Sequence, residues 1–314
     1  MSGRRGERMA WRGAVLACCG LGVAGGCGAA EDPCTLEPAR ERARFAARLD
    51  ALADVEAPPV PDVPEARAPS PSGARWLVDR AAVRLDEATD ARRRFQADPE
   101  RFLADRPPAR WGELLPAPPR ALVAFGAGGA LPEAAGPLLV PVATRARSLG
   151  SEEVALRVAP DLPFATLAAV AFALGEGGVR RLHVATRGPA GEASLPAALP
   201  RRDDPAMARL AVRVALLDEG AVVEDATGAL APGCDEYASA PGPTTGPEPE
   251  ALRACLATVR SAFEGEGTPA AVLTATPAVP FARVADALGA LRGADEEPAF
   301  APVFLSGALS GGSR

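Results

Sequence analysis

The chain has 314 residues, a net charge of −6 and 34 basic residues, all of them arginine because lysine is absent. An acidic protein without a basic stripe is not expected to bind nucleic acid, and we attribute the arginine use to the codon bias of a GC-rich genome. The length allows two domains of ordinary size, and the 33 prolines and 32 glycines favour linkers between them.

Residues 1–26 have the layout of a bacterial secretory signal. Arginines precede an apolar run, Gly13 to Gly26, which is shorter than the roughly 20 residues that span a bilayer as a helix. The motif Ala-Gly-Gly-Cys that ends at Cys27 resembles a lipobox, with Ala where Leu is usual. We therefore expect export and a lipid on Cys27. A cut after Ala29 or Ala30, which releases a soluble periplasmic protein, and a retained anchor remain alternatives.

Two segments are expected between the anchor and the first domain. Residues 27–56 predict a helix near the anchor, because Phe45, Leu49 and Leu52 recur at helical spacing among charged side chains. Residues 57–75 are rich in proline and poor in large apolar side chains. They predict an extended, semi-rigid linker, which at about 3.1 Å per residue would reach roughly 50 Å.

The rest of the chain is predicted to hold two α+β domains. Residues 76–187 form the first and residues 206–307 the second, with a linker at 188–205 between them and a flexible tail at 308–314. Each domain is expected to be a small sheet packed with helices.

The two predicted domains resemble each other. The stretch APDLPFATLAAVAFAL, which begins at Ala159, aligns without a gap with TPAVPFARVADALGAL, which begins at Thr276, at an offset of 117. Each stretch contains a Pro turn and a helix and lies between two strand-like runs. Each domain is also predicted to open with a hairpin, at Trp76 to Leu85 and at Leu210 to Val223. An internal duplication is therefore a hypothesis.

Two cysteines of the second domain are suited to form a disulfide. In an oxidising periplasm Cys234 and Cys255 are the natural pair, and a loop of about 20 residues would stabilise the fold by roughly 3 kcal/mol. Two buried free thiols are the alternative. Cys34 is left over and is available to pair between chains.

The predicted helix from Phe164 to Leu174 is apolar on all sides, with Thr166 as its single polar residue. Such a helix is usually covered on both faces. We expect its outer face to pack on the other domain or on a partner, unless the alanines reflect codon bias alone. The candidate partner-facing side chains are those of Phe164, Leu167, Val170 and Phe172.

The runs Val154 to Thr186 and Ala271 to Arg292 resemble the periplasmic domain of the ExbD/TolR family. The resemblance implies a small α+β domain that works beside a proton-driven motor of the inner membrane and contacts partner proteins or peptidoglycan. It implies no hydrolytic chemistry. Members of this family carry protons on an Asp in a transmembrane helix, whereas the apolar segment Gly13 to Gly26 contains no acidic residue. This chain would keep the binding domain and replace the motor helix with a lipid.

Motifs for catalysis, cofactors and metals are weak. His183 is the only histidine and lies in a predicted strand, so we expect strand packing or solvent contact for it. The glycines that follow the apolar run Ala121 to Phe125 do not complete G-x-G-x-x-G, because Leu131 occupies the third glycine position. Acidic clusters at 203–204 and 295–297 lack the spaced loop of a calcium site. We predict no catalytic residue, cofactor or metal.

Two kinds of residue are candidates for ligand contact. The arginine pairs at 180–181 and 201–202 are suited to an anionic glycan or a lipid headgroup. Trp76 and Trp111 are suited to stack on sugars, although a tryptophan at the start of a strand is more often a core residue.

Together these patterns predict a non-enzymatic adaptor or binding module, lipid-anchored on the periplasmic side of the cell envelope and accessory to an ExbD/TolR-type transport system. Its expected partners are envelope proteins or peptidoglycan, and a homodimer is left open. One alternative is a structural lipoprotein that binds peptidoglycan or an outer-membrane partner. Another is an envelope enzyme whose carboxylate site the sequence does not place.

Overall fold

The computed structural model describes most of the chain after residue 32. The described residues are 33–53, 57–69, 73–132, 139–201, 204–225, 227–229, 231, 234, 245, 248–262, 268–293 and 298–307. The predictions for the signal at 1–26, for Cys27 and for the tail at 308–314 lie outside these residues. No helix in the described ranges is both long enough and apolar enough to cross a membrane.

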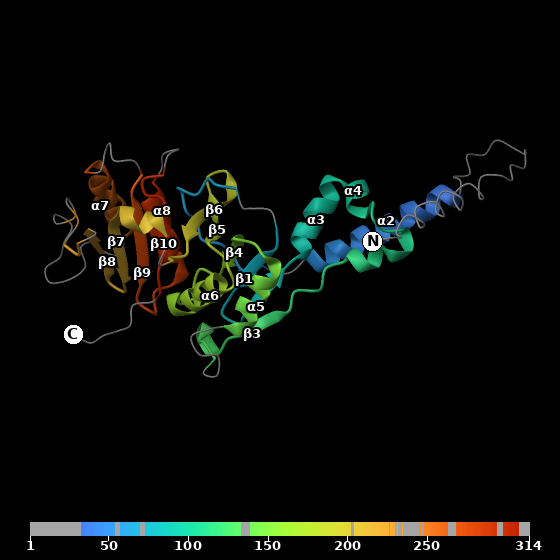
Figure 1. Ribbon diagram of the computed structural model, residues 1–314, viewed down its shortest axis with the longest axis horizontal. Coiled ribbons are helices and arrows are strands. Elements are labelled where there is room, and N and C mark those ends of the chain that lie inside the picture. The colour runs from blue at the N-terminus through green and yellow to red at the C-terminus, as the bar shows by residue number, and fades with distance from the viewer. Residues whose placement is uncertain are drawn as a thin grey trace, which may run out of the picture.

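The described strands form one ten-stranded mixed sheet (Figure 1). Its order is β3-β2-β1-β4-β5-β6-β10-β9-β7-β8. The strands are β1 (Arg75–Val78), β2 (Ala82–Asp86), β3 (Ala121–Ala124), β4 (Glu153–Val158), β5 (Arg181–Gly188), β6 (Gly191–Ala198), β7 (Leu210–Leu217), β8 (Gly220–Asp225), β9 (Ala270–Ala275) and β10 (Val303–Leu305).

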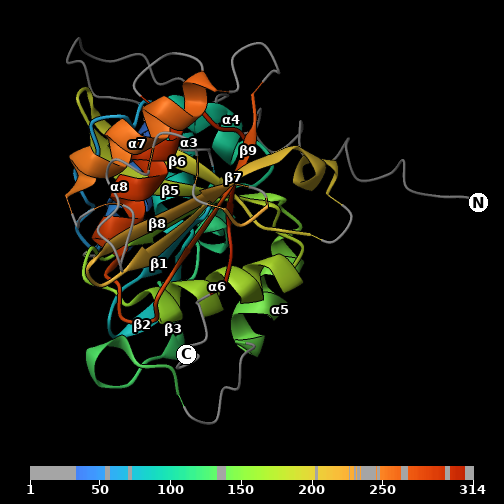
Figure 2. The ribbon, with the colours of Figure 1, turned by 90° about the vertical axis from the view of Figure 1, so that its left-hand side faces the viewer.

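The helices accompany the strands in chain order. The α-helices are α2 (Pro33–Ala53), α3 (Ala88–Ala97), α4 (Pro99–Leu103), α5 (Val140–Leu149), α6 (Phe164–Glu176), α7 (Pro249–Ser261) and α8 (Phe281–Arg292), and the short 3₁₀ helices are η1 (Pro108–Leu114), η2 (Ala127–Gly129) and η4 (Pro205–Arg209). Figure 2 shows α7 and α8 on one side of the strands and α5 and α6 on the other.

The two small sheets that we expected are instead parts of one continuous sheet. The first part of the sheet ends with β6, the second begins with β10, and the two strands share a single register pair, Phe304 with Ala198. The prediction of an α+β fold holds at the level of mixed helices and sheet, but the separation into two sheets is not confirmed. The strand that joins them, β6, lies in the segment for which we expected a linker.

The elements of the predicted repeat are present in both halves. The two hairpins form as β1-β2 and β7-β8, and β4 and β9 each pair in parallel with the strand that follows the next helix. That helix is α6 in the first half and α8 in the second. The strand–turn–helix–strand unit therefore occurs twice, as the alignment of the two runs predicts.

The two halves cap each other's helices through their Pro turns. The backbone N–H of Phe164 donates to the carbonyl of Val279 at 2.8 Å, and the N–H of Phe281 donates to the carbonyl of Leu162 at 2.8 Å. The N–H groups at the start of a helix have no partner within the helix. Neither α6 nor α8 has a side-chain cap, so each obtains its first partner from the other half. This contact is reciprocal, since the two bonds join equivalent positions at the offset of 117.

The Pro-rich segment expected to be a free linker at 57–75 packs on the sheet. Its residues 57–69 form a strap, and its last residue already belongs to β1. The strap pairs with β5, since the N–H of Val63 donates to the carbonyl of Arg187 and the N–H of Arg187 to that of Pro61, both at 2.8 Å. It also pairs with β6, where the N–H of Ser194 donates to the carbonyl of Ala68 at 2.7 Å. The strap is therefore part of the folded unit and not a 50 Å tether.

The strap also binds the second half. The buried carboxylate of Glu65, 7% exposed, accepts a hydrogen bond of 2.5 Å from the guanidinium of Arg253 on α7. A Cβ added to Gly289 on α8 would lie 2.5 Å from Cγ1 of Val63. A side chain at position 289 would displace the strap, so glycine permits this close approach. One segment thus ties both halves together.

The predicted linker at 188–205 contains β6, which pairs with β5 along its whole length. Local sequence conceals this strand, because Pro196 lacks a backbone donor and is unfavourable inside a sheet. Pro196 is tolerated here because its nitrogen faces the outer edge of β6, on the side where the N–H of Ser194 two residues earlier donates to the strap, so no bond to β5 is lost. That edge is covered by the strap at Ser194 and by β10 at Ala198.

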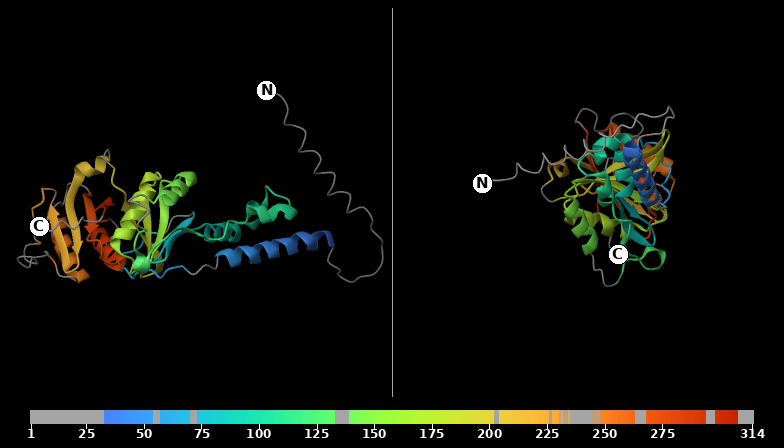
Figure 3. Two further views of the ribbon diagram at one scale, coloured as in Figure 1. Left: turned by 90° about the horizontal axis from the view of Figure 1, so that it is seen from below. Right: turned by 90° about the vertical axis from the view of Figure 1, so that its right-hand side faces the viewer.

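A helical arm projects from the sheet (Figure 3). The predicted stripe of α2 is partly confirmed, since Phe45 and Leu49 are buried while Leu52 is half-buried. The ring of Phe45 lies 5.3 Å from that of Phe95 and 6.0 Å from that of Phe102, between ring centroids. These aromatic contacts hold α2 against α3 and α4.

The predicted cysteine pair is present in the second half. Cys234 and Cys255 lie at disulfide-bonding distance, with their Cα atoms 4.9 Å apart. Both are fully buried, and Cys255 belongs to the apolar stripe of α7. The bond fastens this helix to the segment that follows β8.

Candidate binding cleft

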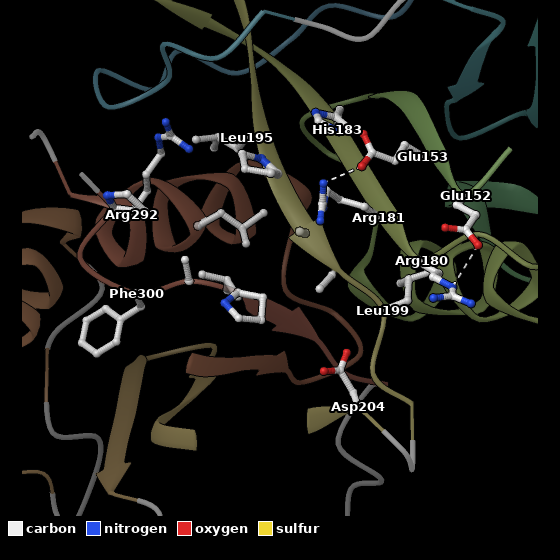
Figure 4. A pocket seen from close by; sticks show the side chains of 18 of the residues that line it. Glu152, Glu153, Arg180, Arg181, His183, Leu195, Leu199, Asp204, Arg292 and Phe300 are labelled. Carbon is white, nitrogen blue, oxygen red and sulfur yellow. Dashed lines mark hydrogen bonds and ion pairs between the residues drawn. The ribbon is translucent and has the colours of Figure 1, made fainter. Parts of the chain in front are cut away.

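A cleft of about 840 Å³ lies where the two halves meet (Figure 4). One wall comes from the ends of β4, β5 and β6, and the other from the C-terminal part of α8 and the chain that leads into β10. It is lined by Glu152, Glu153, Arg180, Arg181, His183, Leu195, Pro196, Ala197, Ala198, Leu199, Arg201, Asp204, Pro205, Leu288, Arg292, Pro298, Phe300, Ala301, Pro302 and Val303.

The wall on the first half carries a cluster of charged side chains centred on Glu153. Its carboxylate lies 2.5 Å from the guanidinium of Arg181 and 3.1 Å from Nε2 of His183. The other ring nitrogen of His183, Nδ1, is buried and has no hydrogen-bond partner among the described residues. A carboxylate at Nε2 favours the tautomer with the proton on Nε2, which leaves Nδ1 as an unused acceptor.

A second ion pair lies at the rim of the same wall. Nε of Arg180 is 3.3 Å from the carboxylate of Glu152, and both side chains are more than half exposed. Exposed pairs of this kind contribute little to stability because solvent screens them. Both side chains can therefore exchange this contact for one with a ligand at little cost.

The opposite wall carries Arg292, the last residue of α8. Figure 4 places this side chain across the cavity from Arg181 and His183. Arg292 is half-buried, and within the described ranges it forms no ion pair. A guanidinium attracts carboxylates and phosphates strongly when it is partly withdrawn from water. The apolar floor beside it is formed by Leu288 and the buried ring of Phe300.

The balance of charge in the cleft differs from that of the chain. Four arginines line it against three carboxylates, whereas the whole protein carries −6. Each of the three carboxylates is already engaged: Glu152 and Glu153 bind arginines, and Asp204 accepts a hydrogen bond from the N–H of Ala206 at 2.8 Å. Arg180 and Arg181 are engaged in the same ion pairs, so the cation of the lining that has no ion pair among the described residues is Arg292.

The lining side chains do not form a recognisable catalytic set. They include no serine, threonine, cysteine or tyrosine that would serve as a nucleophile beside His183. Within the described part of the chain, no group of three or more His, Cys, Asp or Glu side chains is arranged to hold a metal ion.

The structure brings together several residues that the sequence keeps apart. Arg180 and Arg181 line the same cleft as Arg201, because the β5-β6 hairpin returns the chain to this edge. His183 is on β5, as the strand prediction requires, but it faces the cleft and the carboxylate of Glu153. Both tryptophans considered for sugar stacking, Trp76 and Trp111, are buried core residues.

The predicted partner-facing surface of α6 is mostly wrong. Phe164, Leu167 and Val170 are at most 1% exposed and belong to the main hydrophobic core. Phe172 alone of the four is exposed, at 53%. The first turn of this helix contacts the other half through the backbone capping bond of Phe164.

Sequence reasoning missed the second wall of the cleft and the strand β6. Arg292 appears in the sequence as an ordinary cation at a helix end, and Phe300 follows acidic residues that suggest a surface loop. One local signal was available, since GEASLPAA, the sequence of β6, includes an alternation of small and apolar residues. Its Pro196 and the glycines beside it favour the linker interpretation.

Comparison with known proteins adds no family. The chain matches no family model, no curated protein and no solved structure among those compared. The cleft and its side chains are therefore the basis on which a function is argued.

Proposed function

We propose that the protein is a lipid-anchored, non-enzymatic adaptor of the cell envelope that binds a carboxylate-bearing segment of a partner protein in the cleft between its two halves. The envelope part of the proposal rests on the basic, apolar and Cys27-containing layout of the N-terminal sequence. The binding part rests on the cleft. Accessory work for an ExbD/TolR-type transport system is supported by the resemblance of the repeated runs.

The observation that carries the proposal is the position of Arg292. It is a cation without an ion pair in the described residues, it faces the Arg181 cluster across the cleft, and apolar surface lies beside it. Such an arrangement suits a ligand that offers a carboxylate to Arg292 and an apolar stretch to the half-buried prolines of the lining, Pro196, Pro298 and Pro302.

A polypeptide fits this cleft better than a glycan does. Sugar sites commonly use flat aromatic rings for stacking, whereas the lining side chains include no tryptophan or tyrosine, and Phe300 is buried. The cleft instead presents prolines and aliphatic side chains at the edge of β6, which are surfaces that suit an extended chain.

The test is site-specific photo-crosslinking of the full-length protein in the cells that make it. A photo-reactive amino acid replaces Pro205, which is exposed at the cleft, and in a matched control it replaces Glu100, which is exposed on α4. We expect a discrete protein adduct from position 205 and none from position 100, and Arg292→Glu should reduce the adduct about tenfold.

Three results would overturn the proposal. One is an adduct from position 205 that Arg292→Glu leaves unchanged, and another is an adduct that peptidoglycan hydrolysis removes, which would favour the structural lipoprotein. The third concerns the anchor: Cys27→Ser should move the protein out of the membrane fraction, and its retention there would contradict the lipid.

A further inference from the structure

A second hollow lies beside the exposed ring of Phe172. This groove of about 350 Å³ runs between the outer flank of α6 and the chain that follows β10, and its lining includes Ala168, Ala171, Leu199 and Gly307. Phe172 is one of two large apolar side chains that are strongly exposed in the described ranges, the other being Val140 on α5. An exposed aromatic ring beside a groove is suited to anchor a partner.

The internal repeat shows what occupies the corresponding place in the second half. At the offset of 117, Phe172 aligns with Gly289 of α8. Gly289 is buried under the strap, since an added Cβ there would lie 2.5 Å from Val63 and 2.8 Å from the carboxylate of Glu65. The flank of one repeated helix is therefore covered by an extended Pro-rich segment, and the same flank of the other helix is open.

The strand edges follow the same correspondence. The strap pairs with the backbone near the end of β5, at Arg187. β10 occupies the place of β5 in the second half, and the residues that follow it, Ser306 and Gly307, line the groove beside Phe172. Toward β6, β10 forms only the pair Phe304 with Ala198 among the described strands. Leu305, Ser306 and Gly307 thus have no strand partner on that side among the described residues.

We propose that the groove beside Phe172 binds an extended, proline-containing segment of a partner polypeptide, which lies on the Phe172 ring, whereas Gly289 lets the strap lie directly on α8. The occupant has small apolar side chains that pack on the Phe172 ring, and it runs beside the backbone of Ser306 and Gly307. The groove continues into the cleft between the two halves, because Leu199 and Arg201 line both. The inference rests on the proposed function in one respect, namely that the partner is a polypeptide.

The strap sequence itself provides the probe. A fluorescein-labelled peptide with the sequence of residues 57–69, APPVPDVPEARAP, is titrated with the full-length protein, whose own strap already covers α8. Fluorescence anisotropy should show saturable binding. Phe172→Ala should weaken it at least about tenfold, because the exposed ring supplies the anchor. Val140→Ala removes the other exposed apolar side chain and should leave the affinity unchanged.

The contrary outcomes are distinct. No binding to the wild-type protein, or equal binding to Phe172→Ala, would overturn the proposal, and if the crosslink from position 205 persisted, the proposed function would survive this failure. Removal of residues 308–314 should not change the affinity. A gain of about tenfold or more would identify the chain's own tail as the occupant and overturn the proposal of a partner. A dimer of the wild-type protein that dissociates on Phe172→Ala would likewise overturn the proposal of a partner.

Discussion

The two halves of the sheet contain the same strand–turn–helix–strand unit but end it differently. In the first half β5 continues to Gly188 and turns back as β6, so the unit gains a long hairpin. In the second half the corresponding strand, β10, ends at Leu305 after three residues. The unit forms the core and the mutual helix caps in both halves. The two halves differ in the length and continuation of its final strand.

This difference accounts for the cleft. A long β6 beside a short β10 leaves the two strands joined at one pair, and the sheet opens beyond it. The opening is lined by Leu195 and its neighbours on β6 and by Phe300 on the approach to β10. The repeated unit thus leaves a cleft where its two copies are unequal, and forms a shared core where they are equal.

The largest expected effect on stability tests whether the two halves are equivalent. It is the removal of one equivalent aromatic ring from each half. Phe164 and Phe281 are both fully buried, and each begins its helix. Phe164→Ala and Phe281→Ala should each lower the free energy of unfolding by about 3–5 kcal/mol, because each leaves a cavity in the core. Phe172→Ala, at an exposed position, is the control and should change it by less than about 0.5 kcal/mol. Guanidinium denaturation measures all three, and a cost for one ring that is less than half the cost for the other would contradict equivalence.

A smaller effect is expected at the contact between the strap and the second half. Glu65→Gln leaves Arg253 without its buried partner, and because Arg253 is 27% exposed we expect a loss of about 2 kcal/mol, below the usual cost of breaking a fully buried pair. Glu250 is the other carboxylate that pairs with Arg253, and the Glu250 side chain is 79% exposed. Glu250→Gln should therefore cost less than about 0.5 kcal/mol. Urea denaturation compares the two, and equal losses would mean that the strap is not held by Glu65.

The smallest effect concerns a charge that one copy has and the other lacks. Asp286 on α8 aligns with Ala169 on α6, and burial raises the pKa of the Asp286 carboxyl, with Glu65 adding to the rise and Arg253 opposing it. A raised pKa means that protonation favours the folded state, so ionisation costs stability as the pH increases through that pKa.

Asp286→Asn should therefore be more stable than the wild type at pH 7. The gain should stay below about 1 kcal/mol, because the group is half-buried and solvent screens it. It should vanish at about pH 2.5, well below the ordinary aspartate pKa of about 3.9, where the carboxyl is protonated in both states. Urea midpoints at the two pH values give the comparison, and a variant less stable than the wild type at pH 7 would contradict the sign.

Local patterns in the sequence predict the repeated elements well. The last strand is found at Val303–Leu305 as expected, and α8 begins at Phe281 after the Pro turn. These elements are set by apolar periodicity and by prolines, which act over a few residues. The mutual caps explain why α6 and α8 begin without a Ser, Thr or Asp cap, since carbonyl groups from the other half perform that role.

Other features depend on contacts between distant residues. Glu65 meets Arg253 across 188 positions, so the strap has the composition of a linker although it is fixed. The cleft depends on distant contacts in the same way. The arginine pairs in the sequence predicted part of its first wall. Its second wall required the placement of α8 against β6, which no local sequence pattern predicts.

The helical arm determines how load would pass through the molecule. The 21 residues of α2 span about 31 Å, and its Phe45 packs on α3, which begins two residues after β2. Figure 1 shows this arm and the second half of the sheet at opposite ends. Tension applied at Pro33 would therefore act on packed aromatic rings and on paired strands. The described elements would transmit it as one stiff unit.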